Sequence, residues 1–296
     1  MIVRMANGQT IDGDLIVDAT LRDSLTPVPV TFEATIRLKE SFANQLLEGM
    51  EIKVGRDQAP MVIKYVRDSI SSVYQGGMVQ IRYFIALHKN TEGISHRAVK
   101  GIFLENTTLS EIYKACGGKS EIGKDFAVPK FYCFKGETPS YLIARVCQEQ
   151  GGVVRWMPDG DQLEFTRIND LFTQEPIMKL QTLADYTQKS GFLERHELPA
   201  YISCAPDGSI VKGNFDKDRN VEFMPHKTEA QLNSMTDVLI NAKEIPSQFA
   251  PDVHSGQLID GGQIKFAIIT AAHSFRQGAG NGGEESQSVF WTGVKQ

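Results

Sequence analysis

Residues 136–152 read Gly-Glu-Thr-Pro-Ser-Tyr-Leu-Ile-Ala-Arg-Val-Cys-Gln-Glu-Gln-Gly-Gly, and they carry the clearest helix signal in the chain. Thr138 is a favoured N-cap residue, and Pro139 suits the first helical turn because it has no N–H to leave unbonded. Apolar residues follow at helical spacing: Leu142, Ile143, Val146 and Cys147. The stretch therefore predicts a helix with one buried face that ends at the glycine pair.

The sequence on either side extends this helix into a small module. Val153–Met157 and Gln162–Thr166 flank the turn Pro158-Asp159-Gly160-Asp161, which predicts a β-hairpin. Upstream, Thr108-Leu109-Ser110-Glu111 is a capping-box pattern. It precedes an apolar face and a glycine C-cap: Leu109, Ile112, Tyr113, Cys116 and Gly117. We expect residues 104–172 to form an α+β middle domain of two helices and a hairpin.

The segments outside this module have strand patterns. Residues 28–38 alternate apolar and polar side chains, which predicts a strand, and residues 1–103 predict a first β-barrel domain. Residues 173–296 predict a second β-barrel domain with an exposed excursion at 206–226, one amphipathic helix at 228–242 and a buried closing strand within 262–275. The predicted fold is mainly β, with two related small, tube-like β-barrels flanking the α+β module.

An internal echo supports the relation between the two barrels. In the first half, Gly49–Gly55 leads to Val62–Val66, then to the turn Gly76-Gly77 and another strand. In the last quarter, Gly256–Asp260 leads to Phe266–Ile269, then to glycine-rich residues 278–283 and the strand 288–291. Chance similarity between two β-rich stretches is the alternative explanation.

Composition favours an ordinary soluble globular protein: 296 residues, 41% hydrophobic, 23% charged and a net charge of −5. No apolar run is long enough for a membrane span, so no stable membrane insertion is expected. Met1–Gly8 contains no apolar core of a signal peptide, which predicts synthesis and folding in a cytoplasm. The four cysteines form no CxxC pair and are expected to be buried free thiols: Cys116, Cys133, Cys147 and Cys204.

This layout resembles the baseplate hub family of contractile phage tails, which includes the late-control protein D group and the N-terminal part of the VgrG spike protein. Residues 136–152 resemble the helix of the family's middle domain, and Trp156–Phe165 resembles the hairpin that follows it. Phe266–Phe275, with His273, resembles the last strand of the family's second barrel.

The resemblance implies a structural subunit of a virion tail, in the baseplate or tail tip, assembled in the cytoplasm of a host bacterium. Three chains with two barrels each would form a homotrimeric, pseudo-sixfold ring between the tail tube protein and the central spike protein, with other baseplate proteins around it. DNA or effectors would pass through the lumen without specific binding, for which the net charge of −5 is suited.

No catalytic, cofactor-binding or metal-binding residue is predicted, and we expect no cofactor and no enzyme activity. Cys147 and His273 could be imagined as a nucleophile and its base, but Cys147 belongs to the apolar helix face. Asp159 and Asp161 lie in a turn that requires Asp and Gly for its backbone. A calcium loop at 214–225 lacks its glycine and its closing glutamate: Asn214, Asp216, Asp218, Arg219, Asn220 and Pro225.

Two nucleic-acid signals are equally weak. The glycine-rich run 278–283 has no following helix and no Gly-Lys-Ser/Thr, so a loop is expected. Aromatic residues of the first half fit strand packing better than base stacking: Tyr65, Tyr74, Tyr83 and Phe84. Besides the hub, two alternatives stay open: a monomeric β-rich module that binds a cell-surface glycan, which needs a surface aromatic cluster, and a tail-associated peptidoglycan hydrolase.

Overall fold

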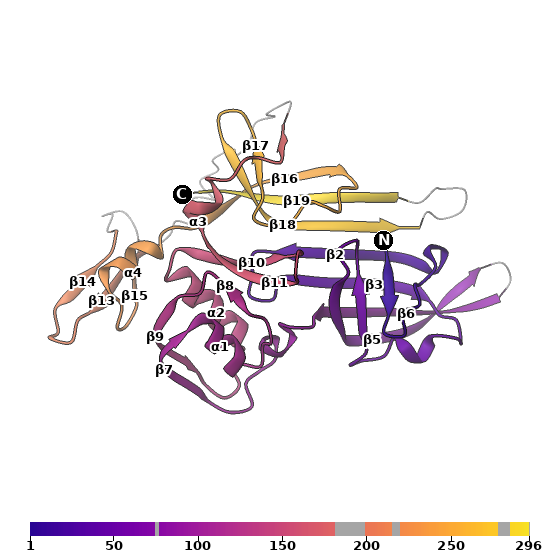
Figure 1. Cartoon of the computed structure of the whole chain (residues 1–296), viewed down its shortest axis with the longest axis horizontal. Coiled ribbons are helices and arrows are strands. Elements are labelled where there is room, and N and C mark those ends of the chain that lie inside the picture. The colour runs from indigo at the N-terminus through magenta and orange to yellow at the C-terminus, as the bar shows by residue number, and fades with distance from the viewer. Residues whose placement is uncertain (75–76, 181–198, 215–219, 278–284, 296) are drawn as a thin grey trace.

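The fold consists of one large sheet with a compact module beneath it and a small projecting sheet to one side (Figure 1). The computed structural model describes residues 1–74, 77–180, 199–214, 220–277 and 285–295. Among these residues, no helix is long and apolar enough to cross a membrane.

The first β-rich segment contributes six strands, with three short 3-10 helices between or after them at Gly13–Leu15, Ala43–Gln45 and Glu92–Ser95. The strands are β1 (Val3–Met5), β2 (Ile16–Ser24), β3 (Val30–Arg37), β4 (Glu51–Val54), β5 (Ala59–Tyr74) and β6 (Gly77–His88).

The middle module contains both predicted helices and the predicted hairpin, together with further short elements. It comprises β7 (Ile102–Thr108), α1 (Leu109–Ala115), β8 (Ile122–Gly123), β9 (Ala127–Cys133), α2 (Pro139–Gln148), β10 (Gly152–Met157), β11 (Gln162–Arg167) and α3 (Ile168–Leu171). The capping box of α1 is present, with Thr108 and Glu111 each accepting from the other's backbone N–H. Gly117 takes the left-handed conformation at φ +96°, as a helix C-cap requires.

The last segment completes the sheet and forms the projecting sheet. Its elements are β12 (Met178–Lys179), β13 (Ala200–Cys204), β14 (Ile210–Lys212), β15 (Val221–Phe223), α4 (Glu229–Ser234), β16 (Leu239–Gln248), β17 (Leu258–Asp260), β18 (Lys265–Arg276) and β19 (Glu285–Lys295). Residues 206–226, predicted as an exposed excursion, contain β14 and β15, which pair with β13 beside α4.

The large sheet joins strands from both ends of the chain. Its eleven strands follow the order β1-β4-β5-β6-β3-β2-β18-β17-β12, with β19 pairing to β18 and β16 pairing to β19. The two β-rich segments join within the sheet through the antiparallel pairing of β2 with β18, from Ser24–Thr270 to Asp18–Arg276. Among the described strands, the pairings do not close either segment into a barrel, so the mainly β class is confirmed without the predicted closure.

The internal echo corresponds to a repeated strand arrangement. The orders β3-β6-β5-β4 and β16-β19-β18-β17 are the same, and all their pairings are antiparallel. The second strand of each echoed stretch carries a bulge at an equivalent place, between Ile63 and Tyr65 in β5 and between Ile268 and Thr270 in β18. Phe84 and Phe290 occupy equivalent register positions, and both are fully buried.

Two sequence predictions in the last segment are wrong. The helix predicted over 228–242 ends at Ser234: the Thr228–Gln231 capping box starts α4 as expected, but residues 239–248 form β16. Pairing with β19 outweighs the weak helical pattern there. Cys204 is exposed at the end of β13, whereas the other three cysteines are buried as predicted.

Candidate functional site: a polar sheet face and the junction behind it

One face of the large sheet is polar where β3, β2 and β18 lie side by side. Cross-strand partners point to the same side of a sheet, and the partners here are rich in hydroxyl groups. This polar face contains Thr20, Arg22 and Ser24 of β2, Thr31, Glu33, Thr35 and Arg37 of β3, and Thr270, Ser274 and Arg276 of β18.

Side-chain hydrogen bonds link β2 to β18 on this polar face. Ser24 Oγ lies 3.0 Å from Thr270 Oγ1, and Thr20 Oγ1 lies 3.2 Å from Ser274 Oγ. Arg22 pairs with Glu33, and Arg37 donates to the Asp14 carbonyl and to Gln277. On the neighbouring strand β5, the Arg67 guanidinium lies over the Tyr83 ring. These three side chains are therefore engaged within the sheet.

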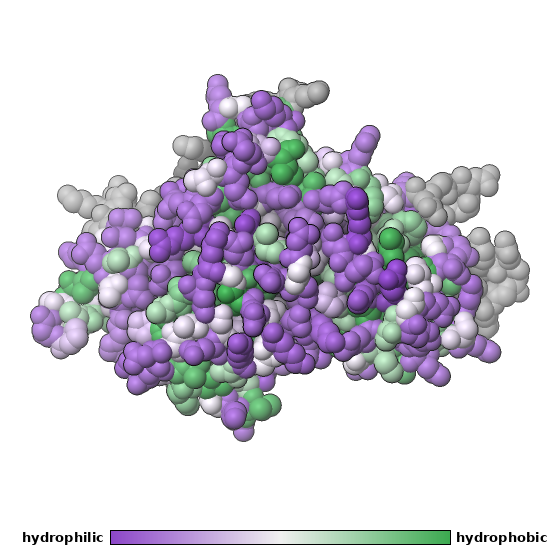
Figure 2. Space-filling view, viewed as in Figure 1, coloured by the Kyte–Doolittle hydropathy of each residue, from purple (hydrophilic) through white to green (hydrophobic). Residues whose placement is uncertain are grey.

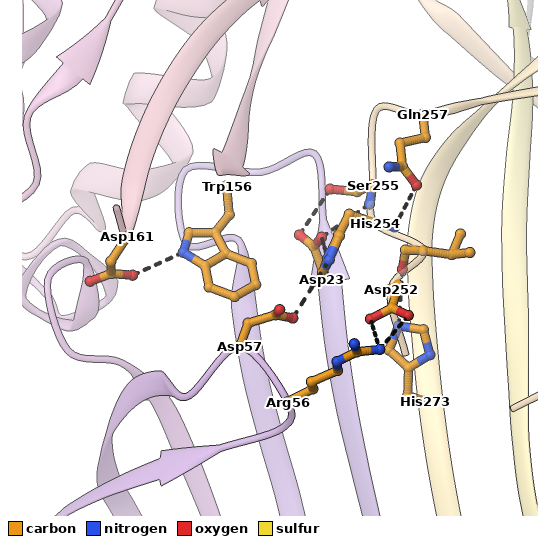
Figure 3. Close-up of polar contacts among 11 residues, drawn as sticks. Asp23, Arg56, Asp57, Trp156, Asp161, Asp252, His254, Ser255, Gln257 and His273 are labelled. Carbon is orange, nitrogen blue, oxygen red and sulfur yellow. Dashed lines mark hydrogen bonds and ion pairs between the residues drawn. The ribbon is translucent and has the colours of Figure 1, made fainter. Parts of the chain in front are cut away.

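The opposite face of β2 buries a carboxylate where all three parts of the chain meet. Asp23 is 2% exposed, and its two carboxylate oxygens accept hydrogen bonds from Ser255 N at 3.0 Å and Ser255 Oγ at 2.9 Å (Figure 3). His254 Nδ1 lies 3.3 Å from Asp23 Oδ2. A buried carboxylate costs stability unless it is paired and hydrogen-bonded, and here the loop before β17 supplies both kinds of partner.

His254 also faces the turn between β4 and β5. Its Nε2 lies 3.6 Å from Asp57 Oδ2, and the neighbouring Arg56 and Asp252 form an exposed ion pair at 2.7 Å. Burial lowers the pKa of His254, but the close carboxylate of Asp23, with the charges of Asp57 and Asp252, outweighs this and raises the pKa above its ordinary value. The fold therefore favours the protonated imidazolium of His254 more than the unfolded chain does.

The middle module joins the same cluster through Trp156. The Trp156 ring packs edge-on against His254, with centroids 5.7 Å apart, and its Nε1 donates to Asp161 Oδ1 at 2.9 Å (Figure 3). Asp161 also accepts from Asn90 Nδ2 and lies 2.7 Å from the buried His88 Nε2. Burial raises the pKa of Asp161, but the hydrogen bonds from His88, Trp156 and Asn90 outweigh this effect and lower the pKa below its ordinary value, which favours the ionised carboxylate.

His273 and Cys147 are held in separate structural environments. His273 Nδ1 lies 2.9 Å from Ser288 Oγ and Nε2 lies 3.1 Å from the Val253 carbonyl, so both ring nitrogens have partners inside the protein. Burial lowers the pKa of His273 and favours the neutral ring. Cys147 lies in the main core on α2, where burial raises the pKa of its thiol to about 12. The structure therefore does not assemble the two into a nucleophile and its base.

The remaining sequence candidates divide between structural roles and residues that are not described. Asp159 lies in the β10–β11 turn, where Gly160 and Asp161 have positive φ angles. Asn214 donates to Thr236 Oγ1, whereas Asp216, Asp218 and Arg219 lie outside the described residues, as do residues 278–284. Tyr65 and Tyr83 pack edge-on within the sheet, and the side chain of Tyr74 lies outside the description. In the described part of the chain, no group of three or more His, Cys, Asp and Glu residues could hold a metal ion.

Sequence reasoning did not identify the junction cluster. Asp23, Asp57, Trp156 and His254 come from four distant stretches, and none belongs to a recognisable motif. The one local signal is Asp23, a charged residue on the face of β2 that otherwise carries Ala19 and Leu21. An acidic residue on a buried strand face requires a partner, but the sequence does not say which.

The fold defined by these elements is that of phage tail proteins. The chain covers 95% of a tail protein from Neisseria meningitidis MC58 with a TM-score of 0.64 and 12% identity, and 100% of this chain is aligned. It covers 97% of the 43 kDa tail protein of prophage MuSo2 from Shewanella oneidensis with a TM-score of 0.64 and 14% identity, over 99% of this chain.

The same fold occurs in a secretion machine. The E. coli c3393 protein is a component of the type VI secretion system with structural similarity to the T4 tail proteins gp27 and gp5, and this chain covers 76% of it. That match aligns 99% of this chain with a TM-score of 0.55 and 10% identity. No protein-family model and no curated protein sequence matches the chain. The comparisons therefore show a fold shared at low identity.

Proposed function

We propose that this protein is a structural subunit of a phage-like tail baseplate hub and forms a homotrimeric ring with pseudo-sixfold symmetry. The ring joins the tail tube to the central spike and surrounds the passage for DNA or effectors. The protein performs no chemical step and is located in the tail tip of an assembled particle.

The observation that carries this proposal is the strand repeat. The units β3-β6-β5-β4 and β16-β19-β18-β17 lie in one chain and one sheet, so three chains supply six similar units. Such a ring matches a sixfold tube on one side and a threefold spike on the other. The similarity to tail proteins along nearly the whole chain supports the same assignment.

The polar face of the large sheet is the proposed wall of the passage. It extends over β3, β2 and β18, and it presents hydroxyl groups beside Arg22 and Arg37, which have partners within the protein. A DNA chain would meet few free cations there, and binding to DNA depends on neutralising its phosphates. Sliding without attachment is the behaviour that a conduit needs.

The native mass of the purified chain tests the ring. We expect light scattering at several concentrations to give three times the chain mass of 32.9 kDa, and electron microscopy to show threefold particles with a central opening. If the chain alone is monomeric, the measurement is repeated after co-expression with a spike protein from the same tail gene cluster. A stable dimer or tetramer, or a monomer in both experiments, would contradict the proposal.

A further inference from the structure

A groove lies between helix α2 and the small sheet β13–β15, away from the polar face and from the junction cluster. Its cavity has a volume of about 300 Å³. The lining residues come from both sides: Tyr141, Ala144, Arg145 and Gln148 of α2, with Tyr201 of β13, Glu222 of β15 and Met224. Nothing in the proposed hub function uses this groove.

Tyr141 stands at the mouth of the groove with its ring in solvent. It is 74% exposed although it belongs to the first turn of a helix whose other large apolar residues are at least partly buried. Packing within the chain does not explain a tyrosine in this position. An exposed aromatic ring beside a polar hollow is a common feature of binding sites, because the ring offers an apolar face and a hydroxyl group together.

The groove walls carry a complete set of hydrogen-bonding groups. Arg145 supplies donors and Glu222 supplies acceptors. Gln148 Nε2 donates to the Met235 carbonyl at 3.2 Å and to the Tyr201 hydroxyl at 3.5 Å, so Gln148 offers its carbonyl oxygen as an acceptor. In the part of the chain that the structure describes, neither Arg145 nor Glu222 forms an ion pair, although both act on the Tyr201 hydroxyl. Burial, with the charge of Glu222, raises the pKa of Tyr201, so its hydroxyl is protonated at neutral pH. A guanidinium, a carboxylate, an amide and a phenol can together bind several hydroxyl groups of one ligand.

Arg145 also lines a second hollow of about 140 Å³, which reaches Tyr132 of β9. The two lysines of this hollow are paired: Lys227 with Glu149 at 2.6 Å, and Lys130 with Glu105 at 3.5 Å. Tyr132 contacts the Phe103 ring, and Phe103 contacts Phe134, and all three rings are substantially exposed. In Figure 2 hydrophobic residues gather at the lower left edge of the molecule, over β7 and β9. Aromatic surfaces therefore lie on both sides of Arg145.

This combination favours one class of ligand. The paired lysines offer little attraction for a nucleic acid or a strongly acidic polymer. A protein interface usually has an apolar, charge-depleted core, whereas Arg145, Gln148 and Glu222 occupy the centre of this groove. Aromatic faces alternating with neutral sets of donors and acceptors suit a ligand that has apolar ring faces and many hydroxyl groups.

We propose that the groove binds a neutral oligosaccharide, with a sugar ring on Tyr141, hydroxyl groups on Arg145, Gln148 and Glu222, and the chain running toward Tyr132. A structural tail protein would thereby also contact a carbohydrate of the cell surface. This binding does not depend on the ring: the groove is built from one chain.

The test is calorimetric titration of the full chain with chitotetraose, cellotetraose and maltotetraose. We expect at least one to bind with a Kd of about 1 mM or tighter. Tyr141→Ala and Arg145→Gln should each weaken this binding about tenfold or more, which corresponds to about 1.4 kcal/mol. Tyr65→Ala, which removes an exposed tyrosine from β5 of the large sheet, is the matched control and should leave the affinity within about twofold.

Two outcomes would overturn the proposal. One is the absence of binding to all three sugars, and the other is binding that neither variant weakens. Poly-glutamate is titrated in parallel, and binding to it without binding to any sugar would assign the groove to an acidic polypeptide instead. Thermal unfolding verifies that each variant is folded. Because Tyr141 is exposed, Tyr141→Ala should fold, and its affinity tests the proposal even if Arg145→Gln does not fold.

Discussion

At the scale of single residues, Asp23 is the carboxylate on which the junction depends. Removing it leaves the Ser255 N–H and hydroxyl without their acceptor and His254 without its nearest anion. We predict that Asp23→Ala lowers the free energy of unfolding by about 3–5 kcal/mol, because breaking a buried pair strands the remaining partner. Urea unfolding at neutral pH measures the change.

Asp252→Ala is the control for Asp23→Ala. Asp252 pairs with Arg56 only a few residues from His254, but both side chains are mostly exposed. Asp252→Ala should lower the free energy of unfolding by less than about 1 kcal/mol, because the attraction within an exposed ion pair contributes little to stability. If the two variants lost the same free energy of unfolding, the burial of Asp23 would not contribute to its effect on stability.

His254 and His273 should affect the stability of the fold in opposite directions as the pH changes. The raised pKa of His254 contributes stability that is present below its ordinary pKa of about 6.5 and is lost as the pH rises through the folded-state value. The lowered pKa of His273 has the reverse effect: stability is lost as the pH falls through about 6.5 toward the folded-state value.

Histidine-to-glutamine variants measure these contributions separately. We predict that His254→Gln lowers the free energy of unfolding more at about pH 6 than at about pH 8.5. We predict that His273→Gln lowers it more at about pH 8.5 than at about pH 6. Urea unfolding of both variants and the parent chain at the two pH values gives the four differences. A cost for His254→Gln that does not change with pH would show that its ion pairs with Asp23 and Asp57 do not form.

At the scale of elements, the two long helices differ in how their first turns are capped. Thr108 accepts from Glu111 N and completes a capping box, whereas Thr138 begins α2 without a side-chain cap hydrogen bond. Thr108→Ala should therefore lower the free energy of unfolding by about 1 kcal/mol, and Thr138→Ala by a few tenths. Chemical denaturation of the two variants compares them directly, and similar losses would contradict the observed geometry.

The same local signals explain which elements could be predicted from sequence. The α1 capping box, the turn at Asp159–Asp161 and the glycine-bounded strands of the repeat are encoded within a few residues, so the middle module and the repeat were predicted. The segment 239–248 was not, because its strand exists through pairing with β19, about 45 residues further along the chain. The junction around Asp23 depends on contacts more distant still and carries no local signature.

The α2 groove illustrates the same limit for a site. The glycan-binding alternative required a surface aromatic cluster, and the alternating pattern of β7 and β9 did not reveal that Phe103, Tyr132 and Phe134 share an exposed face. Register between strands decides which side chains meet, and that register is set by tertiary packing. On the opposite side of Arg145 the groove is lined by Tyr201 and by Glu222, and Glu222 lies in residues 206–226, which the sequence predicted only as an exposed excursion.

At the scale of the whole molecule, stability should be unevenly distributed. β18 is paired with β2 on one side and with β19 on the other, so its central amides open only when both repeats separate. The projecting sheet β13–β15 has its own small core around Tyr201, Met224, Leu232 and Met235. Regions with few buried contacts open with lower free energies than the main core of a protein.

Hydrogen exchange should therefore separate these regions. We predict that amides of β18 exchange only through global unfolding, whereas those of β13 and α4 exchange several hundredfold faster or more, which corresponds to a difference of about 3–4 kcal/mol in opening free energy. Mass spectrometry of peptides from residues 265–276 and 200–204 measures both in one sample. Equal protection would show that the projecting sheet is part of the main cooperative unit, and the groove beside α2 would then be a rigid feature. Faster exchange that slows on adding a bound oligosaccharide would show that the groove is ordered by its ligand.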